Sequence, residues 1–179
     1  MKSLIIYFSA TGNTEKVAQT IYRCLVRKNI DTILLKVQDA DRLELYDYDL
    51  IFFGTPSIEF LPAQPVMKYI AEKLKLHRQR GDLKLCAPKL PGKTAVVFCT
   101  YSGPYTGKKP ALITTGYMRQ FFEHIGFNVA GEWHTVGEFH KREDLSTGGK
   151  LGDIRGRPNK KDLSRIEKSV SKLVTTLLI

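Results

Sequence analysis

Apolar residues form five short runs along the chain, separated by charged or turn-forming residues. The first run, residues 2–8 (KSLIIYF), is almost continuously β-branched or aromatic, which is typical of a strand buried on both faces of a parallel sheet. Four further runs have the composition of strands: residues 32–37 (TILLKV), 50–53 (LIFF), 94–100 (TAVVFCT) and the more polar 128–136. The pattern therefore predicts five strands.

Between these runs, apolar residues recur at the three- and four-residue spacing of amphipathic helices. One such stretch begins at Glu15, a second begins at Pro65, a third ends at Gly126, and the last continues from Pro158 to the end of the chain. Proline in a first turn and glycine just beyond a helix end are both favoured at those positions. We predict an irregular connection over residues 76–93 and a long loop over 137–157, since neither segment has a clear period.

Strands that alternate with helices favour an α/β fold, because parallel strands need a crossover to return the chain. We expect a doubly wound, five-stranded parallel sheet with helices on both faces. The length of 179 residues suits one domain, and no repeat, low-complexity tract or linker divides the chain. The prediction is a single domain over residues 1–179.

The chain has 28 Lys and Arg against 18 Asp and Glu, a net charge of +10, and the whole excess lies after residue 72. A basic surface favours anionic partners. The three cysteines include no C-x-x-C pair, which argues against a disulfide framework, structural zinc or an iron–sulfur cluster. No apolar run is long enough for a secretory signal or a transmembrane segment. We therefore expect a cytoplasmic protein with no metal site.

The segment 9–14 (SATGNT), between the first strand and the first helix, has the chemistry of a phosphate site. Backbone N–H groups at a helix N-terminus lack internal partners and lie at the positive end of the helix dipole, and hydroxyls add further donors. Gly12 permits a tight turn next to the anion. The segment is neither a Walker A loop nor a G-x-G-x-x-G turn, and it contains no basic residue. It therefore predicts a phosphate monoester bound by neutral donors.

This segment resembles the flavodoxin signature T/S-x-T-G-N-T, and the order of strands and helices is similar to that family across nearly the whole chain. The resemblance implies a flavodoxin-like three-layer sandwich with strand order 2-1-3-4-5. It also implies FMN as the cofactor, with the phosphate bound by Ser9, Ala10 through its backbone, Thr11, Gly12, Asn13 and Thr14.

Flavodoxins place the flavin ring between the loops that follow the third and fourth strands. The matching loops here are residues 54–61 (GTPSIEFL), closed by Pro62, and residues 100–107 (TYSGPYTG). Ser57 and Ile58 would lie along one face of the ring, and Tyr101 or Tyr105 would stack on the other. Alternatively, Ile58, Phe60 and Tyr105 only anchor the loops in the core. The resemblance implies cofactor contacts from Thr55, Pro56, Ser57, Ile58, Thr100, Tyr101, Ser102, Gly103 and Tyr105.

Three features differ from the electron-carrying flavodoxins. The third-strand loop has no tryptophan, because Trp133 falls on the fifth strand. The chain is basic, whereas those carriers are usually acidic, and nearby cations raise the potential of a flavin that gains negative charge on reduction. The third feature is the long segment 137–157.

We expect the segment 137–157 to emerge beside the flavin loops as a lid or a basic rim. Arg155 and Arg157 could bind a carboxylate or the phosphate of NADPH, or could be solvated charges before the last helix. His134 and His140 could supply a proton to a quinone, or could be structural or exposed.

Two functions fit these features. The first is an FMN-binding redox protein that passes electrons to a redox partner protein, for which an acidic partner would suit the basic surface. The alternative is a reductase of the same fold that moves electrons from NAD(P)H or another donor to a small acceptor such as a quinone. The electron carrier needs no catalytic side chain, because the flavin carries the chemistry. We expect no nucleic-acid partner, because the basic residues form no aromatic-interleaved motif.

Overall fold

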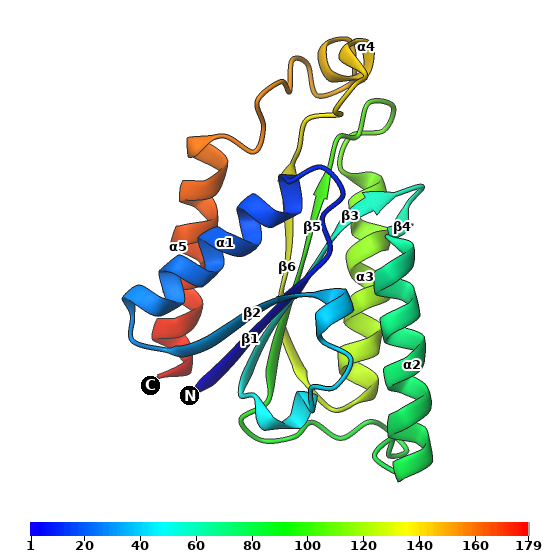
Figure 1. The fold of residues 1–179 in the computed structure, drawn as a ribbon, viewed down its shortest axis with the longest axis vertical. Helices are drawn as coiled ribbons and strands as arrows, with labels where there is room; N and C mark the ends of the chain where they lie inside the picture. Colours follow the sequence, from blue (N-terminus) through cyan, green and yellow to red (C-terminus); the bar gives the residue numbers. More distant parts are fainter. Residues whose placement is uncertain (179) are drawn as a thin grey trace.

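The computed structural model describes residues 1–178 and contains one parallel sheet (Figure 1). Its strands are β1 (Lys2–Tyr7), β2 (Asp31–Lys36), β3 (Leu50–Ile58), β5 (Thr94–Tyr101) and β6 (Asn128–Val136). They lie in the order β2-β1-β3-β5-β6, and every neighbouring pair in this order is parallel. This confirms the predicted α/β fold, because the five strands in chain order have the predicted arrangement 2-1-3-4-5.

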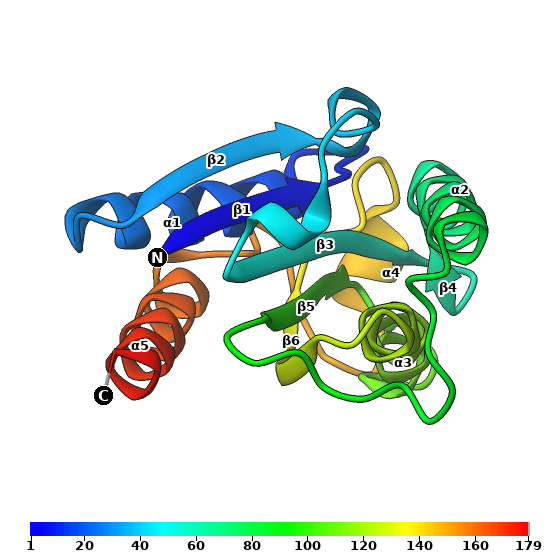
Figure 2. The same cartoon turned by 90° about the horizontal axis from the view of Figure 1, so that it is seen from below.

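Helices cover both faces of the sheet. Figure 2 shows α1 (Asn13–Arg27) and α5 (Lys160–Leu177) on one face, and α2 (Gln64–Arg80) and α3 (Lys109–His124) on the other. The short helix α4 (Glu143–Thr147) lies beyond the sheet, at the end where the parallel strands finish (Figure 1). The arrangement is a three-layer sandwich.

Each face of the sheet has its own hydrophobic core, because the side chains of a strand alternate between the two faces. The core under α1 and α5 contains Ile5, Phe52 and Val96 from the strands. The core under α2 and α3 contains an aromatic cluster, in which successive rings lie in edge-to-face or tilted contact: Phe53, Tyr69, Phe121, Phe122 and Phe127. The two cores fix the positions of the strand ends that form the site.

The third strand is longer than its apolar run indicates. Residues 54–58 were predicted as loop, but β3 continues through them, since Thr55 and Pro56 pair with Cys99 and Thr100 of β5. Beyond that point the chain turns back in a short antiparallel hairpin with β4 (Leu61–Pro62). The predicted loop 54–61 is therefore mostly extended backbone.

Helix α2 also continues beyond its predicted end, to Arg80, where we expected an irregular connection from residue 76. Two polar side chains on its buried face hid the helical period. The Lys73 ammonium donates hydrogen bonds to the carbonyl oxygens of Asp41 and Leu43, at 2.8 and 2.7 Å, and the buried His77 ring hydrogen-bonds to Asp82 at 2.9 Å.

The remaining differences are small helical turns, η1 (Val37–Asp39), η2 (Leu45–Asp47) and α4, which the sequence pattern did not predict. Among residues 1–178, no helix combines the length and apolar character needed to cross a bilayer. The same residues bring together no group of three potential metal ligands from His, Cys, Asp and Glu.

Candidate functional site

The segment 9–14 connects the end of β1 to the start of α1, as predicted. The Gly12 backbone N–H donates a hydrogen bond of 3.1 Å to the Ser9 hydroxyl, and the Gly12 carbonyl accepts the N–H of Lys16 at 3.0 Å. Gly12 has a φ of +90°, and a Cβ there would meet nothing within 4 Å. Backbone conformation, rather than crowding, therefore requires glycine at this position.

Side chains from distant elements hold this segment in place. Asn13 and Thr14 are both buried. The Asn13 amide nitrogen donates to the Glu138 carbonyl at 2.9 Å, and its oxygen lies 3.3 Å from Nε2 of His140. The Thr14 hydroxyl lies 2.8 Å from the hydroxyl of Thr100, at the end of β5. The loop is thereby fixed to the end of β5 and to the segment that follows β6.

The acid in the first turn of α1 is also held in place. The phenol of Tyr7 donates a hydrogen bond of 2.9 Å to the Glu15 carboxylate. Burial, together with this hydrogen bond, raises the pKa of Tyr7 to about 12, so the phenol stays protonated at neutral pH. This bond fixes the orientation of the only carboxylate in that turn.

The ends of β3 and β5 provide the other two walls of the site. The Ser57 hydroxyl lies 2.7 Å from the hydroxyl of Thr114 in α3. The Ser102 hydroxyl donates to the Gly137 carbonyl at 2.8 Å, and the Gly137 N–H donates to the Tyr101 carbonyl at 2.9 Å. Burial raises the pKa of Tyr101, so its ring is available as a neutral aromatic surface.

A pocket of about 300 Å³ lies where these segments meet, and we refer to it as the cofactor pocket. It occupies the carboxyl ends of the parallel strands, where open α/β sheets bind ligands. Predicted residues from all three loops line it: Ser9, Ala10, Thr11, Asn13, Thr14, Pro56, Ser57, Ile58, Thr100, Tyr101 and Ser102.

Four of the predicted site residues do not line the cofactor pocket. The side chain of Thr55 is buried and accepts the N–H of Ala63 at 3.0 Å, so it holds the hairpin. Gly12 and Gly103 shape their loops. Tyr105, one of the two candidates for ring stacking, is 78% exposed and does not reach the pocket, which leaves Tyr101 as the aromatic residue on that side.

Four further lining residues follow directly on β6 and were not among the predicted cofactor contacts: Gly137, Glu138, Phe139 and His140. They belong to the segment 137–157, which we expected beside the flavin loops. A Cβ on Gly137 would lie 2.7 Å from the amide nitrogen of Asn13, so the close approach of these two loops depends on glycine. The position of residues 137–140 directly after the fifth strand indicated this location, because the carboxyl ends of parallel strands meet at one edge of the sheet.

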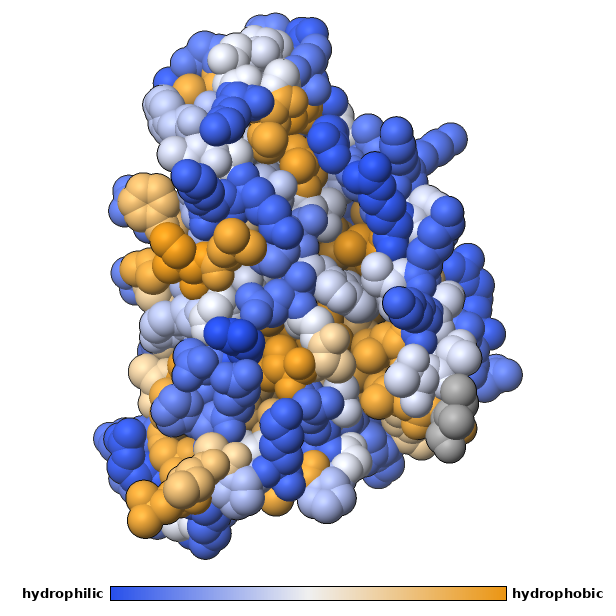
Figure 3. Space-filling model, turned by 180° about the vertical axis from the view of Figure 1, so that it is seen from behind, coloured by the Kyte–Doolittle hydropathy of each residue, from blue (hydrophilic) through white to orange (hydrophobic). Residues whose placement is uncertain are grey.

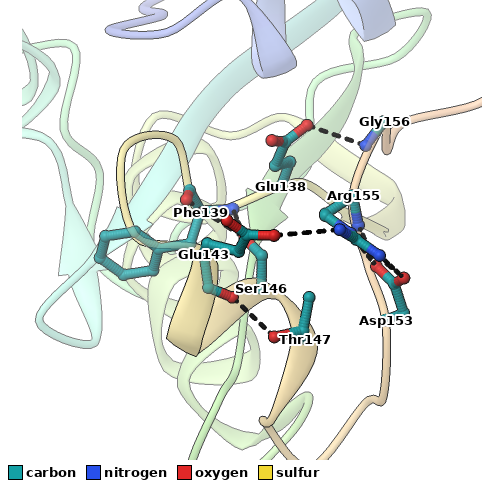
Figure 4. A network of polar contacts seen from close by, with 8 residues as sticks. All are labelled: Glu138, Phe139, Glu143, Ser146, Thr147, Asp153, Arg155 and Gly156. Carbon is teal, nitrogen blue, oxygen red and sulfur yellow. Dashed lines mark hydrogen bonds and ion pairs between the residues drawn. The ribbon is translucent and has the colours of Figure 1, made fainter.

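The rest of the segment 137–157 holds itself together through polar contacts (Figure 4). The Arg155 guanidinium contacts the carboxylate of Asp153 at 2.7 Å and that of Glu143 at 3.1 Å. The Lys150 N–H donates to the Pro104 carbonyl at 2.7 Å, which joins the segment to the loop after β5. These contacts support residues 137–140, the part of the segment that lines the cofactor pocket.

The two arginines that we expected to be available for a ligand are both paired. Arg155 contacts Asp153 and Glu143, and Arg157 forms a bidentate ion pair with Asp162. This outcome favours the structural interpretation of these two residues over a role in binding a carboxylate or NADPH.

The donors of the cofactor pocket suit a phosphorylated flavin. The segment 9–14 offers hydroxyls, an amide and a helix N-terminus, all neutral, which fits a phosphate group bound without a metal. Ile58 and Tyr101 stand on the other two loops and offer apolar and aromatic surface for a planar ring. Cys99, behind the pocket, is buried, and burial raises the pKa of its thiol, so it takes no part as a thiolate.

Comparison with known proteins agrees with this arrangement. The family model for flavodoxin matches residues 5–154. The chain is 25% identical over 186 residues to an NAD(P)H dehydrogenase (quinone) of Archaeoglobus fulgidus, a match that covers 83% of this chain and 92% of that protein. It is 43% identical over 54 residues to a flavodoxin of Maridesulfovibrio salexigens, which is 30% of this chain and 37% of that protein's length.

The solved structure of oxidised Flavodoxin 1 from Bacillus cereus has a TM-score of 0.69 and 16% identity to this chain, and the match covers 98% of both chains. This likeness concerns the fold. The family model covers most of the chain, including the segment 9–14 and the ends of the strands that form the cofactor pocket. The chain therefore belongs to the flavodoxin family, whose members bind a flavin.

Proposed function

We propose that this protein binds FMN in the cofactor pocket and carries electrons on it. The observation that supports this most directly is the meeting of three loops, after β1, β3 and β5, around one pocket at the carboxyl edge of the sheet. One loop has the chemistry of a phosphate site, and the other two offer surfaces for a planar ring. Bound FMN would supply the redox chemistry, and the protein would supply binding and orientation.

The residues of the cofactor pocket would divide this work. The Thr11 and Thr14 hydroxyls and the N-terminus of α1 would bind the phosphate, whose charge the helix dipole favours. Ile58 and Tyr101 would contact the two faces of the ring. Phe139, 39% exposed beside the pocket, would limit the access of water to it.

The charge of the protein should influence the potential of the bound cofactor. A reduced flavin carries more negative charge than an oxidised one, and a net charge of +10 stabilises added negative charge. We therefore expect a higher two-electron potential than in an acidic flavodoxin. Raising the salt concentration should lower that potential, because salt screens surface charges.

Electrons would leave through an apolar surface beside the cofactor pocket. Exposed apolar residues gather over the β3–β4 hairpin and the start of α3, at the left of Figure 3: Ile58, Phe60, Leu61, Leu112 and Ile113. We propose that an acidic redox protein docks here, with the basic surface steering its approach. A rate of electron transfer that falls with salt would support this partner.

The first experiment compares FMN with riboflavin. Apoprotein should bind FMN at least about 100-fold more tightly than riboflavin, since only FMN offers a phosphate to the charged hydrogen bonds of the segment 9–14. Thr11→Asp adds a negative charge to an exposed position of that segment and should remove most of this difference. Thr175→Asp makes the same exchange at an exposed site on α5 and should keep it.

Calorimetry or flavin fluorescence quenching measures both affinities, and mass spectrometry of the cofactor released from the purified protein identifies it. Equal affinities for FMN and riboflavin would contradict the assignment of the phosphate site. A protein that binds neither compound would overturn the proposed function.

A second candidate function is reduction of a quinone by NAD(P)H. It is favoured by the relative from Archaeoglobus fulgidus, because that match spans most of both chains. Steady-state oxidation of NADPH or NADH, with and without a soluble quinone, distinguishes the two. A quinone-dependent rate would favour the reductase, whereas reduction only by a protein donor would favour the carrier.

We also propose that the protein acts in the cytoplasm. Cys24, Cys86 and Cys99 are all free thiols, which suits a reducing compartment.

A further inference from the structure

A second pocket, of about 310 Å³, lies along the open edge of β6, and we call it the edge pocket. Figure 3 looks onto this edge of the molecule, with hydrophilic side chains of α5 beside a recess. The lining residues come from the end of β5, the loop before α3, β6, the segment before α5 and α5 itself: Tyr101, Lys108, Glu132, Trp133, His134, Thr135, Val136, Arg157, Asp162, Arg165, Ile166 and Ser169.

Both carboxylates of the edge pocket already have a cation. Asp162 forms its ion pair with Arg157, and its side chain is only 5% exposed. Glu132 lies 3.5 Å from Arg119 and accepts the Thr115 hydroxyl at 2.7 Å. The charges of both acidic side chains are therefore offset by arginines of the same chain.

Two further cations of the edge pocket are not neutralised in this way. Within residues 1–178, neither Lys108 nor Arg165 has a carboxylate oxygen within 4.0 Å of its side-chain nitrogens. They approach the pocket from opposite sides of the sheet edge, since Lys108 precedes α3 and Arg165 lies on α5. Among the lining residues, the three cations exceed the two carboxylates by one, and Arg119, outside the lining, partly offsets the charge of Glu132. Lys108 and Arg165 are thus left without an acidic partner in the described part of the chain.

The floor between these cations is aromatic and apolar. Trp133 packs against Phe52, with ring centroids 5.6 Å apart, and Ile166 is buried. Tyr101 lines both the edge pocket and the cofactor pocket, so one aromatic side chain separates the two. A ligand with a charged group and an organic body would find a partner for each part.

We propose that the edge pocket binds the phosphate group of a small molecule through Lys108 and Arg165. A phosphate monoester carries a charge of about −1.5 to −2 at neutral pH, which matches the two unneutralised cations, whereas a single carboxylate matches only one. Arginine offers a planar pair of donors to phosphate oxygens and lysine a mobile point charge. Ser169 lies on the same wall, where its hydroxyl donates a hydrogen bond of 3.0 Å to the Arg165 carbonyl.

The test uses the only tryptophan of the chain as a reporter, since Trp133 lines the edge pocket. Its indole N–H gives one signal in a ¹H–¹⁵N spectrum, which needs no further assignment. The spectrum is followed while inorganic phosphate or AMP is added to the protein saturated with FMN, and again to protein without added FMN. In the first titration, FMN prevents the added phosphate from occupying the cofactor pocket. The second titration is needed because binding at the edge pocket does not depend on the proposed function.

The variant that tests the site is the double substitution Lys108→Gln with Arg165→Gln. It should weaken the apparent affinity at least about tenfold, because two charge-assisted contacts are lost. The matched control is Lys109→Gln with Lys168→Gln, which removes the same charge from exposed neighbours that do not line the edge pocket. The control should stay within about threefold of the original affinity, the effect of a change in surface charge alone.

Each outcome decides the proposal. A saturating shift of the indole signal that the Lys108 and Arg165 substitutions abolish, and the control keeps, supports it. Tighter binding of AMP than of inorganic phosphate identifies a nucleotide-like ligand, whereas equal affinities identify a site for the phosphate group alone. No shift with either probe, or equal weakening in both double variants, overturns it.

Discussion

The hydroxyl oxygens of Thr14 and Thr100 lie 2.8 Å apart, and both side chains are buried. Thr14 belongs to the first turn of α1 and Thr100 to the end of β5. This contact therefore joins the segment 9–14, which we call the phosphate segment, to one wall of the cofactor pocket. Both residues line the cofactor pocket, and each hydroxyl gives the other a hydrogen-bond partner in this buried position.

Thr100→Val removes one partner of this pair at nearly constant shape. The Thr14 hydroxyl then loses its hydrogen bond in the interior, and we expect the free energy of unfolding to fall by about 1–3 kcal/mol. The affinity for FMN should fall as well, since the phosphate segment loses a fixed point. Chemical denaturation and FMN titration measure the two effects.

The control is Thr20→Val, which removes another buried hydroxyl from the same helix. The Thr20 hydroxyl donates to the Lys16 carbonyl of α1, outside the cofactor pocket. This variant should bind FMN like the original protein. If both variants lost FMN affinity equally, the hydroxyl pair would have no special role in the site.

Gly137→Ala tests the contact between the segment after β6 and the phosphate segment. The new Cβ would lie 2.7 Å from the amide nitrogen of Asn13, which must move. We expect a destabilisation of about 1–3 kcal/mol from this crowding, together with weaker FMN binding. Thermal unfolding with and without FMN would show a smaller stabilisation by FMN in the variant.

Gly116→Ala is the matched substitution at a glycine without neighbours. Gly116 lies inside α3, and a Cβ there would meet nothing within 4 Å. The exchange should raise the free energy of unfolding by about 0.5–1 kcal/mol, because alanine loses less conformational entropy in a helix. This variant should keep its FMN affinity. If it lost FMN affinity as Gly137→Ala does, crowding at Gly137 would not be the cause of the weaker binding.

Arg157→Ala should be much more harmful than Arg155→Ala, although the two residues are neighbours in the sequence. Arg157 neutralises Asp162, whose side chain is 5% exposed, and removing the cation leaves a buried charge at a cost of about 3 kcal/mol. Arg155 contacts exposed carboxylates, so its loss should change stability little. Urea denaturation of both variants at neutral pH measures the difference.

The Arg157 variant should also respond differently to acid. Burial alone raises the pKa of Asp162, but its hydrogen bonds with Arg157 and with the Asn159 backbone outweigh this, and the net effect lowers the pKa below its usual 3.8. The stabilisation is therefore present above that value and is lost as the pH falls through the lower folded-state pKa. In Arg157→Ala, the buried Asp162 carboxyl loses the cation that lowers its pKa, so its folded-state pKa should rise and this loss of stability with falling pH should shrink or reverse.

His134 predicts a separate change of stability with pH. Burial, followed by the charge of Lys108, lowers the pKa of His134 from 6.5 to about 4. The unfolded chain then binds a proton that the folded protein does not, so stability should be complete above pH 6.5 and decline as the pH falls towards 4. In His134→Gln, this part of the pH dependence should disappear; an unchanged profile between those values would show that another group causes it.

Much of the fold could be predicted because its signals are local. The strand at residues 128–136 has the bounds that its pattern indicated, and the apolar period that begins near Glu15 matches α1. The end of β3 could not be predicted, since Thr55 and Pro56 are extended only because β5 pairs with them. Pairing between distant strands leaves no mark in the sequence of either strand.

The site shows the same limit. The segment 9–14 was identified from six consecutive residues, and the structure places it in the cofactor pocket. His140 was considered only as a proton donor or an exposed residue, and its contact with Asn13 could not be predicted, because that contact joins residues 127 positions apart. The pairing of Arg157 with Asp162 was equally hidden, although the two residues are only five positions apart, since many side-chain orientations are compatible with that spacing.

The long-range contact between Asn13 and Glu138 has a consequence for synthesis of the protein. The two residues are 125 positions apart, and the cofactor pocket needs both of their segments. A growing chain presents the phosphate segment early, but it cannot close the pocket until β6 and the residues after it have left the ribosome. Only a nearly complete chain should therefore bind the flavin. Truncated products would lack the flavin and would be colourless.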